Sequence, residues 1–200
     1  MDASVPNDPG DPADLVKGAA CGDSSSWNVL VTRFSGLIWA VTGGFGLAHD
    51  DRSDVCQTTW LKLAEQLDRI EHPERIGGWL ATTARREAIR LARARQRVTP
   101  TADAFVFDLR PDERSPERAL LEAEQVILDQ ARMRRLLRAF EQLSVRCRRL
   151  LRVQLASPPP SYAEVAAGLD MPIGSIGPTR ARCLKTLRAK LGPDGYEEQA

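Results

Sequence analysis

The segment 79–98, WLATTARREAIRLARARQRV, constrains the fold more than any other stretch of this chain. On a helix, at about 100° per residue, its small and aliphatic residues share one arc: Leu80, Ala84, Ala88 and Leu91. Four arginines step along a second arc: Arg86, Arg90, Arg93 and Arg97. Like charges four residues apart repel, so this row costs on the order of 1 kcal/mol, with no acidic partner expected on its face. The row spans roughly 16 Å, and either solvent or the phosphates of a nucleic acid face it.

The charge of the chain is arranged in blocks, although its net value is only +1. Residues 1–78 sum to −6, residues 79–97 to +5, residues 98–129 to −5 and residues 130–157 to +7. Two basic modules separated by an acidic segment indicate polyanion partners for the modules. With 42% hydrophobic residues in a chain of 200, we expect two small helical domains rather than one large core.

Cysteine and histidine usage argues against metal chemistry. The four cysteines, Cys21, Cys56, Cys147 and Cys183, lie far apart in sequence without a C-x-x-C pair, and the chain has two histidines. We therefore expect a reduced, cytoplasmic protein that needs no metal or cofactor. The N-terminal residues lack a basic and apolar leader pattern, and no run of about 18 apolar residues follows, so we expect no export and no membrane insertion.

Helical spacing organises the first part of the chain. After a disordered start at 1–12, we expect a short helix over 14–21 and a core helix that Ser24, Ser25 or Ser26 caps and that ends at Gly43 and Gly44. The next helix carries Val55, Thr59, Leu63 and Leu67 at every fourth position, after a cap at Asp50, Asp51 or Ser53. This spacing places Asp54 in its first turn, and a loop over 69–78 leads to Trp79.

The remainder reads as a linker and a helix-turn-helix. Residues 98–118 contain three prolines and no sustained period, which predicts a linker with a small apolar patch at 105–109. Helical spacing returns at Ala119 and resumes after Ser144. Ser161 and Glu164 form a capping-box pattern that opens a short helix, and a basic helix follows from about Gly174 with Pro178 in its first turn. Such a pair predicts a helix-turn-helix, with Arg182 and Lys185 facing the groove and Arg180 within the apolar arc.

These segments resemble the extracytoplasmic-function (ECF) sigma factors, the minimal two-domain sigma factors of bacterial RNA polymerase, over about residues 14–191. The first match contains DDRSDVCQTTWLKLAEQLDRI and GGWLATTARREAIRLARARQR, where Asp54, Gln57 and Trp79-Leu80 carry the family pattern. The second contains SYAEVAAGLDMPIGSIG and TRARCLKTLRAKL. The chain departs from the family at Arg86 and Arg90, where Asn and Asp are usual, and at Pro178-Thr179, where S-R is common.

The resemblance implies an all-α fold of two small helical domains joined by a flexible acidic linker. A disordered N-terminus over 1–12 would precede a region 2-like domain over 13–97. The acidic, proline-rich linker would span 98–128, the region 4-like helix-turn-helix domain 129–192, and a tail 193–200.

The resemblance also implies the partners and the residues that meet them. Core RNA polymerase would be bound through the β′ clamp and the β flap, with the clamp meeting Asp54, Gln57 and Lys62. The minus-ten element of promoter DNA would meet Arg75, Arg86, Arg90, Arg93 and Arg97. The minus-thirty-five element would meet Ser175, Thr179, Arg180, Arg182 and Lys185. An anti-sigma factor is a further expected partner, and the polymerase rather than this chain would supply the catalysis.

Two other classes of protein share part of this pattern. A helix-turn-helix repressor or activator, which binds DNA without being a polymerase subunit, accounts for residues 130–191 but not for the basic helix after Trp79-Leu80. An enzyme acting on nucleic acid, such as a resolvase, needs a catalytic serine on an α/β sheet, and the first half shows no strand alternation. Trp60 and Trp79 are either core residues or stacking surfaces for bases.

Overall fold

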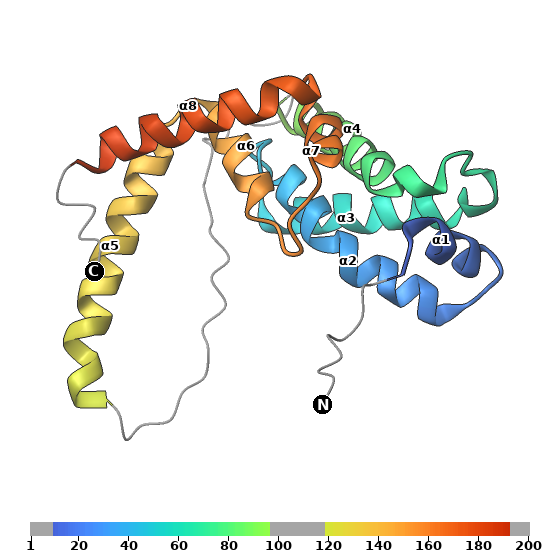
Figure 1. Cartoon of the computed structure of the whole chain (residues 1–200), viewed down its shortest axis with the longest axis horizontal. Coiled ribbons are helices and arrows are strands. Elements are labelled where there is room, and N and C mark those ends of the chain that lie inside the picture. The colour runs from blue at the N-terminus through green and yellow to red at the C-terminus, as the bar shows by residue number, and fades with distance from the viewer. Residues whose placement is uncertain (1–9, 97–118, 193–200) are drawn as a thin grey trace, which may run out of the picture.

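The computed structural model describes residues 10–96 and 119–192, and within these ranges the secondary structure is entirely helical (Figure 1). In chain order the elements are α1 (Pro12–Ala20), α2 (Ser24–Thr42), α3 (His49–Ala64), the 3₁₀ turns η1 (Leu67–Arg69) and η2 (Pro73–Arg75), α4 (Ile76–Gln96), α5 (Ala119–Glu141), α6 (Val145–Gln154), α7 (Tyr162–Leu169) and α8 (Ile173–Leu191). We call α1–α4 the N-terminal half and α5–α8 the C-terminal half. The all-α prediction is confirmed. The start at 1–9, the apolar patch at 105–109, Arg97 and the tail lie outside the described residues.

Helix starts in the N-terminal half differ from prediction in three places. Asp23, not a serine, caps α2, and its carboxylate accepts from the backbone N–H groups of Ser25 and Ser26 at 3.0 Å. Helix α3 begins at His49 after Ala48 without a side-chain cap, which places Asp54 beyond its first turn. Helix α4 begins at Ile76 rather than Trp79. Gly77 and Gly78, which were expected in the loop over 69–78, therefore lie in its first turn.

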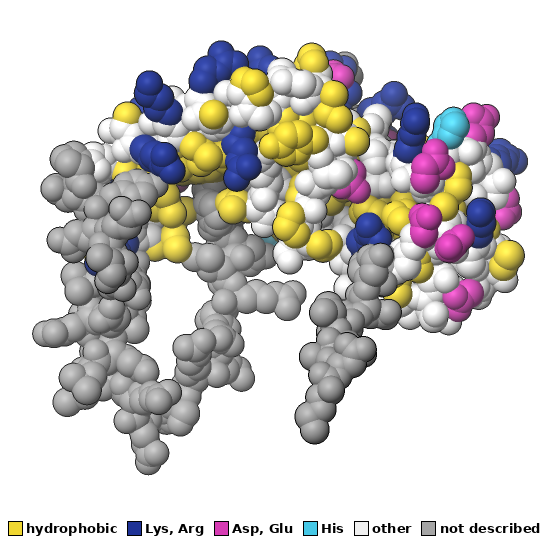
Figure 2. All heavy atoms as spheres, in the orientation of Figure 1, with side chains coloured by type: hydrophobic (Ala, Val, Ile, Leu, Met, Phe, Trp, Pro, Cys, Tyr) yellow, Lys and Arg dark blue, Asp and Glu magenta, His cyan; other side chains and the backbone are white. Residues whose placement is uncertain are grey.

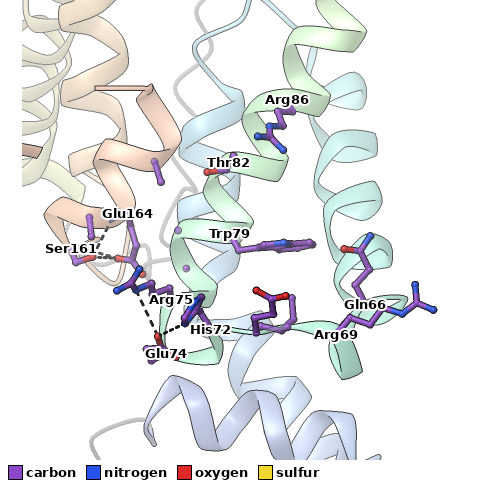
Figure 3. Close-up of a pocket in the computed structure, with 16 residues that line it drawn as sticks. Gln66, Arg69, His72, Glu74, Arg75, Trp79, Thr82, Arg86, Ser161 and Glu164 are labelled. Carbon is purple, nitrogen blue, oxygen red and sulfur yellow. Dashed lines mark hydrogen bonds and ion pairs between the residues drawn. The ribbon is translucent and has the colours of Figure 1, made fainter. Parts of the chain in front are cut away.

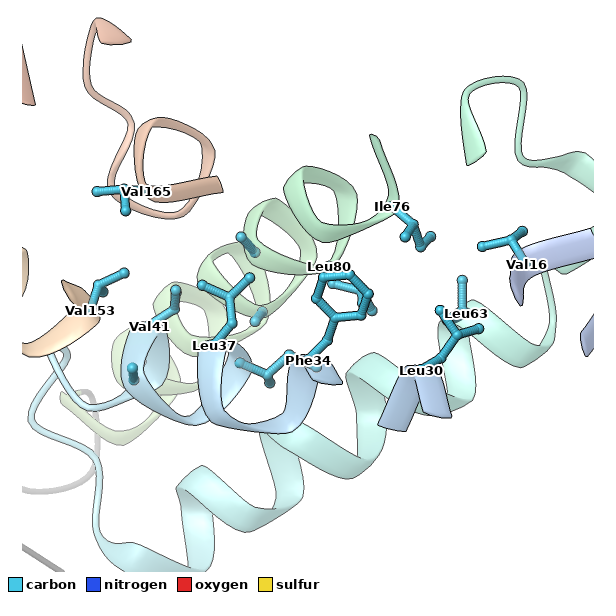
Figure 4. Close-up of a cluster of buried hydrophobic side chains, with 14 of the residues drawn as sticks. Val16, Leu30, Phe34, Leu37, Val41, Leu63, Ile76, Leu80, Val153 and Val165 are labelled. Carbon is cyan, nitrogen blue, oxygen red and sulfur yellow. The ribbon is translucent and has the colours of Figure 1, made fainter. Parts of the chain in front are cut away.

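The main core lies between α2 and α4 and extends into the C-terminal half (Figure 4). Its fully buried side chains come from α2, α3 and α4, among them Leu30, Ile38, Leu63, Ile76 and Leu80. Four more come from the C-terminal half: Leu150, Val153, Val165 and Ile176. Burying one such side chain stabilises a protein by roughly 1.5–3 kcal/mol. The two halves therefore share one continuous interior, whereas the division into domains remains a prediction.

Helices α7 and α8 form the predicted pair. The Ser161–Glu164 capping box is present, with the Ser161 N–H donating to the Glu164 carboxylate at 2.6 Å. Asp170 ends α7 in the left-handed conformation, with φ of 56°. The prediction that Pro178 lies in the first turn of α8 is wrong, because the helix already begins at Ile173 and Pro178 lies inside it.

A disulfide joins α6 to α8, which corrects the expectation of a fully reduced chain. Cys147 and Cys183 are 36 residues apart in sequence, but the packing of α6 on α8 brings their Cα atoms to 5.4 Å. Phe140, Leu143 and Leu151 surround the bond in a second, smaller core. Of the other cysteines Cys21 is exposed, and burial raises the pKa of the Cys56 thiol to about 11. The distance between cysteines in sequence was therefore a poor guide to their pairing.

Candidate nucleic-acid interface

A pocket of about 660 Å³ opens where the segment 66–75 meets the start of α4 (Figure 3). Its rim carries charges of both signs, and its cationic residues are Arg69, Arg75 and Arg86. Trp79 lines it from α4, and Figure 3 shows the indole ring reaching from α4 toward the end of α3. In such an arrangement a base can stack on the flat aromatic side chain while the guanidinium groups hold its phosphate.

The arginine row on α4 is exposed beside this pocket, but one of its members has an acidic partner. Arg86, Arg90 and Arg93 are exposed. The Arg90 guanidinium donates to the Glu87 carboxylate at 2.8 Å, and the Lys62 ammonium donates to the other oxygen of Glu87 at 2.5 Å. The expectation of a face without an acidic partner is therefore wrong, because Glu87 lies next to the row and reaches Arg90 three residues on.

Glu87 is held as a carboxylate in a mostly buried place. Only 9% of its side chain is exposed. Burial by itself raises its pKa, but the hydrogen bonds from Lys62 and Arg90 outweigh burial, so the pKa of Glu87 lies below its ordinary value. The acid thereby fixes one arginine of the row and one lysine of α3. Arg90 keeps 76% of its side chain exposed, so it still has donors to offer a phosphate.

The predicted polymerase-binding residues divide into two groups on α3. Asp54 and Gln57 are exposed and lie on one face, three residues apart. Leu61 is 59% exposed, and helical spacing places it on that same face. Lys62 instead turns toward α4 to meet Glu87. The surface formed by Asp54, Gln57 and Leu61 joins an apolar side chain to hydrogen-bonding groups, as protein interfaces commonly do.

The predicted residues of α8 also divide. Arg180, Arg182 and Lys185 are exposed, and Figure 2 shows Lys and Arg side chains gathered along the edge of the molecule that α8 forms. Helical spacing places Arg180 on the apolar arc, but its side chain is exposed in the structure. Thr179 is only 7% exposed, so it faces the interior rather than a ligand. Ser175 is half-buried, and its hydroxyl donates to the Pro172 carbonyl at 2.7 Å.

Sequence reasoning missed several residues that shape these surfaces. Leu61 lies off the arc of Val55, Thr59 and Leu63, and that spacing could have marked it as exposed. Asp51 is buried and accepts from Arg95 at 2.5 Å, which ties the start of α3 to the end of α4, and only the fold brings them together. Trp60, which the sequence left as either a core or a stacking residue, packs at the edge of the main core, with its ring centroid 5.8 Å from that of Trp27.

Together these features define an all-helical protein with two exposed cationic surfaces, one on α4 beside a pocket and one on α8. Among the described residues no group of acidic, histidine or cysteine side chains could hold a metal ion. None of the described helices is long and apolar enough to cross a membrane.

Residues 30–98, which contain α3, α4 and most of α2, match the model of the sigma-70 region 2 family. The resemblance to bacterial sigma factors is thereby confirmed, and this part of the chain is a sigma-70 region 2 domain. The solved structure of CnrH in complex with the cytosolic domain of CnrY has the same fold, with a TM-score of 0.56 at 20% identity. The alignment covers 92% of this chain and 99% of that chain. No curated protein matches the sequence.

Proposed function

We propose that this protein is a sigma factor of the ECF type, which binds core RNA polymerase in the cytoplasm and directs it to specific promoters. The observation that carries the proposal is the sigma-70 region 2 match over 30–98, since the cationic row of α4 and most of the residues that line the pocket lie within it. The chain is a specificity subunit in this proposal, and the polymerase forms the phosphodiester bonds.

Promoter opening needs two kinds of contact, and the two cationic surfaces suit them. The pocket beside α4 would hold a base removed from the stack, with Trp79 as a stacking surface and Arg75 at the rim. Arg86, Arg90, Arg93 and Arg97 would hold the backbone of the same strand at the minus-ten element.

Helix α8 would enter the major groove of the minus-thirty-five element. Arg180, Arg182 and Lys185 are the exposed cations suited to reach bases or phosphates, and Ser175 lies near the start of the helix. The burial of Thr179 leaves it a supporting role, in which its hydroxyl accepts from the Arg182 guanidinium at 3.4 Å.

Protein partners would use other faces. The face of α3 formed by Asp54, Gln57 and Leu61 would meet the clamp of the polymerase β′ subunit, with Lys62 at its border. The C-terminal half would meet the β flap. CnrH, solved together with the cytosolic domain of CnrY, supports a further regulatory protein partner of the anti-sigma kind.

Reconstitution with bacterial core RNA polymerase tests the proposal. We expect the protein to co-purify with core and to direct run-off transcription from a defined subset of a promoter library. Asp54→Ala with Gln57→Ala should weaken core binding, while Arg182→Ala should weaken use of the promoter and leave core binding intact. Sequence-specific binding of duplex DNA by the protein alone, without binding to core, would instead identify a helix-turn-helix repressor or activator.

A further inference from the structure

A buried carboxylate lies beside the arginine row of α4 and joins that helix to α3. Only 9% of the Glu87 side chain is exposed. One of its oxygens accepts from the Lys62 ammonium at 2.5 Å, and the other accepts from the Arg90 Nε–H at 2.8 Å. The Arg90 Nη2 atom also lies 2.8 Å from that second oxygen. Each oxygen therefore holds one cation, and we call Lys62, Glu87 and Arg90 the triad.

The contact with Glu87 fixes the orientation of the Arg90 guanidinium. Its Nε and Nη2 edge faces the carboxylate, so the end that carries Nη1 points away from Glu87. Because 76% of the Arg90 side chain is exposed, this outer end is open to a ligand. A guanidinium that is already held by one edge has less conformational freedom to lose when its other end meets a phosphate. Arg90 is therefore organised for phosphate binding before the ligand arrives.

Lys62 stabilises this arrangement from α3. Its side chain is 39% exposed, yet its ammonium turns toward α4 and meets Glu87. Burial raises the pKa of Glu87, but the hydrogen bonds from Lys62 and Arg90 lower the pKa by more, so the carboxyl group stays ionised. Two cations share one carboxylate, which leaves the triad with a net positive charge. Glu87 can thus orient Arg90 without cancelling the positive charge of the surface.

We propose, on the basis of the proposed function, that Glu87 is a positioning residue for the minus-ten strand. It holds the Arg90 guanidinium with its outer end toward the strand, where Arg90 donates to a backbone phosphate, and Lys62 in turn holds Glu87. Glu87 itself stays out of contact with the DNA, because its side chain is almost fully buried. Helix α3, which is proposed to meet the polymerase, thereby also supports the strand-binding row of α4.

The direction of one effect separates positioning from simple charge. Glu87→Gln keeps the size of the side chain and removes a negative charge beside the arginine row. Charge alone predicts that this variant binds a polyanion more tightly than the wild type does. Positioning predicts the opposite result, because Arg90 regains freedom that it must lose again on binding, and this loss weakens binding by about fivefold.

Asp51→Asn is the matched control. Asp51 is also a buried acid that joins α3 to α4, since it accepts from Arg95 at 2.5 Å. Its substitution therefore removes the same charge and a similar contact between the same two helices. Arg95 lies about 140° from Arg90 around the helix, which places it off the arginine row. Asp51→Asn should bind the strand as tightly as the wild type or more tightly.

Fluorescence anisotropy with holoenzyme tests the inference. The probe is a single-stranded oligonucleotide that carries the minus-ten element of a promoter selected from the run-off library. For Glu87→Gln we expect binding about fivefold weaker than that of the wild type. The slope of log affinity against log salt concentration should also fall by about the amount expected for one lost phosphate contact. In an Arg90→Ala background, Glu87→Gln should weaken binding no further, because Glu87 acts through Arg90.

Arg90→Lys changes an exposed side chain and tests the inference even if Glu87→Gln does not fold. Lysine keeps the charge but lacks the guanidinium fork that holds Glu87 with one edge and a phosphate with the other end, so binding should again weaken by about fivefold. Undiminished binding by Glu87→Gln or by Arg90→Lys would overturn the inference, as would equal weakening by Asp51→Asn. Failure of the wild-type protein to bind core would overturn the sigma assignment and the inference with it, so the two failures are distinguishable.

Discussion

Between α2 and α4 the interior is filled by large aliphatic side chains, whereas between α6 and α8 a disulfide and a handful of residues close a much smaller core. In the N-terminal half two ion pairs join α3 to α4: Lys62 with Glu87, and Asp51 with Arg95. The C-terminal half instead relies on the Cys147–Cys183 bond and on docking against its neighbour. A small helical unit with little apolar area needs such external or covalent support, while a larger one does not.

Loss of the disulfide should have the largest effect on stability. The disulfide closes a loop between cysteines 36 residues apart in sequence. The double substitution Cys147→Ala with Cys183→Ala opens this loop and should lower the free energy of unfolding by about 4 kcal/mol, because the unfolded chain gains entropy. Hydrogen exchange should accelerate in α6 and α8 much more than in α2 and α4. Cys21→Ser, at an exposed position, is the control and should leave exchange unchanged. A loss of less than about 1 kcal/mol would mean that the C-terminal half does not depend on the bond.

A cavity in the main core should reduce stability somewhat less than loss of the disulfide, and it should destabilise both halves together. Leu80→Ala removes a fully buried side chain and should lower the free energy of unfolding by about 3 kcal/mol. Urea denaturation should show a lower midpoint for the fluorescence and circular dichroism signals alike, because the core is shared. Leu61→Ala, at a 59% exposed position, should change stability by less than about 0.5 kcal/mol. Separate transitions in the Leu80 variant would contradict a shared interior.

Neutralising Glu87 should have a smaller, pH-dependent effect. Glu87→Gln should cost about 1 kcal/mol at neutral pH, since Lys62 and Arg90 lose charged hydrogen bonds but remain partly solvated. The pKa of Glu87 is lowered on folding, so its contribution is complete above its unfolded pKa of 4.5 and fades as the pH falls through its lower folded pKa. The stability difference between wild type and variant should therefore shrink on acidification below about pH 4.5. A difference that persists at low pH would contradict a role for the charge.

The smallest effects should separate the two cationic surfaces by the DNA that each one binds. Arg182→Ala should weaken binding to duplex carrying the minus-thirty-five element by about tenfold, as expected for loss of a base contact. Arg86→Ala should weaken binding of the single-stranded minus-ten element. It should also reduce the slope of log affinity against log salt concentration by about the amount expected for one lost phosphate contact. Fluorescence anisotropy of holoenzyme on each DNA measures both effects, with Lys17→Ala, at an exposed position of α1, as the control. If each substitution weakened binding to both DNAs equally, the two cationic surfaces would not have separate DNA targets.

The helical fold and its two cationic helices could be predicted from sequence because both depend on spacing along one helix. Leu80, Ala84 and Ala88 fall on the arc that the structure buries, and Arg86 and Arg93 fall on the arc that it exposes. The Ser161–Glu164 capping box is likewise a contact between residues three apart. Each depends on neighbours within one or two turns, so periodicity is sufficient.

The partners of individual side chains depended on distant segments and could not be predicted in this way. The sequence predicted no acidic partner for the arginine row, yet Glu87 meets both Arg90 of that row and Lys62 of α3, 25 residues away. Thr179 is buried although the resemblance implied that it meets DNA, because α8 packs on α6 and α7.

By itself, then, the sequence determined the helices, their amphipathic faces and the basic character of α4 and α8, since local geometry dictates all three. Only the tertiary structure decided that Cys147 meets Cys183, that Glu87 pairs with Lys62, and that Gly77 lets Glu164 of α7 approach α4. Those contacts join residues remote in sequence. The packing of whole helices brings them together, and no periodic pattern along the chain records it.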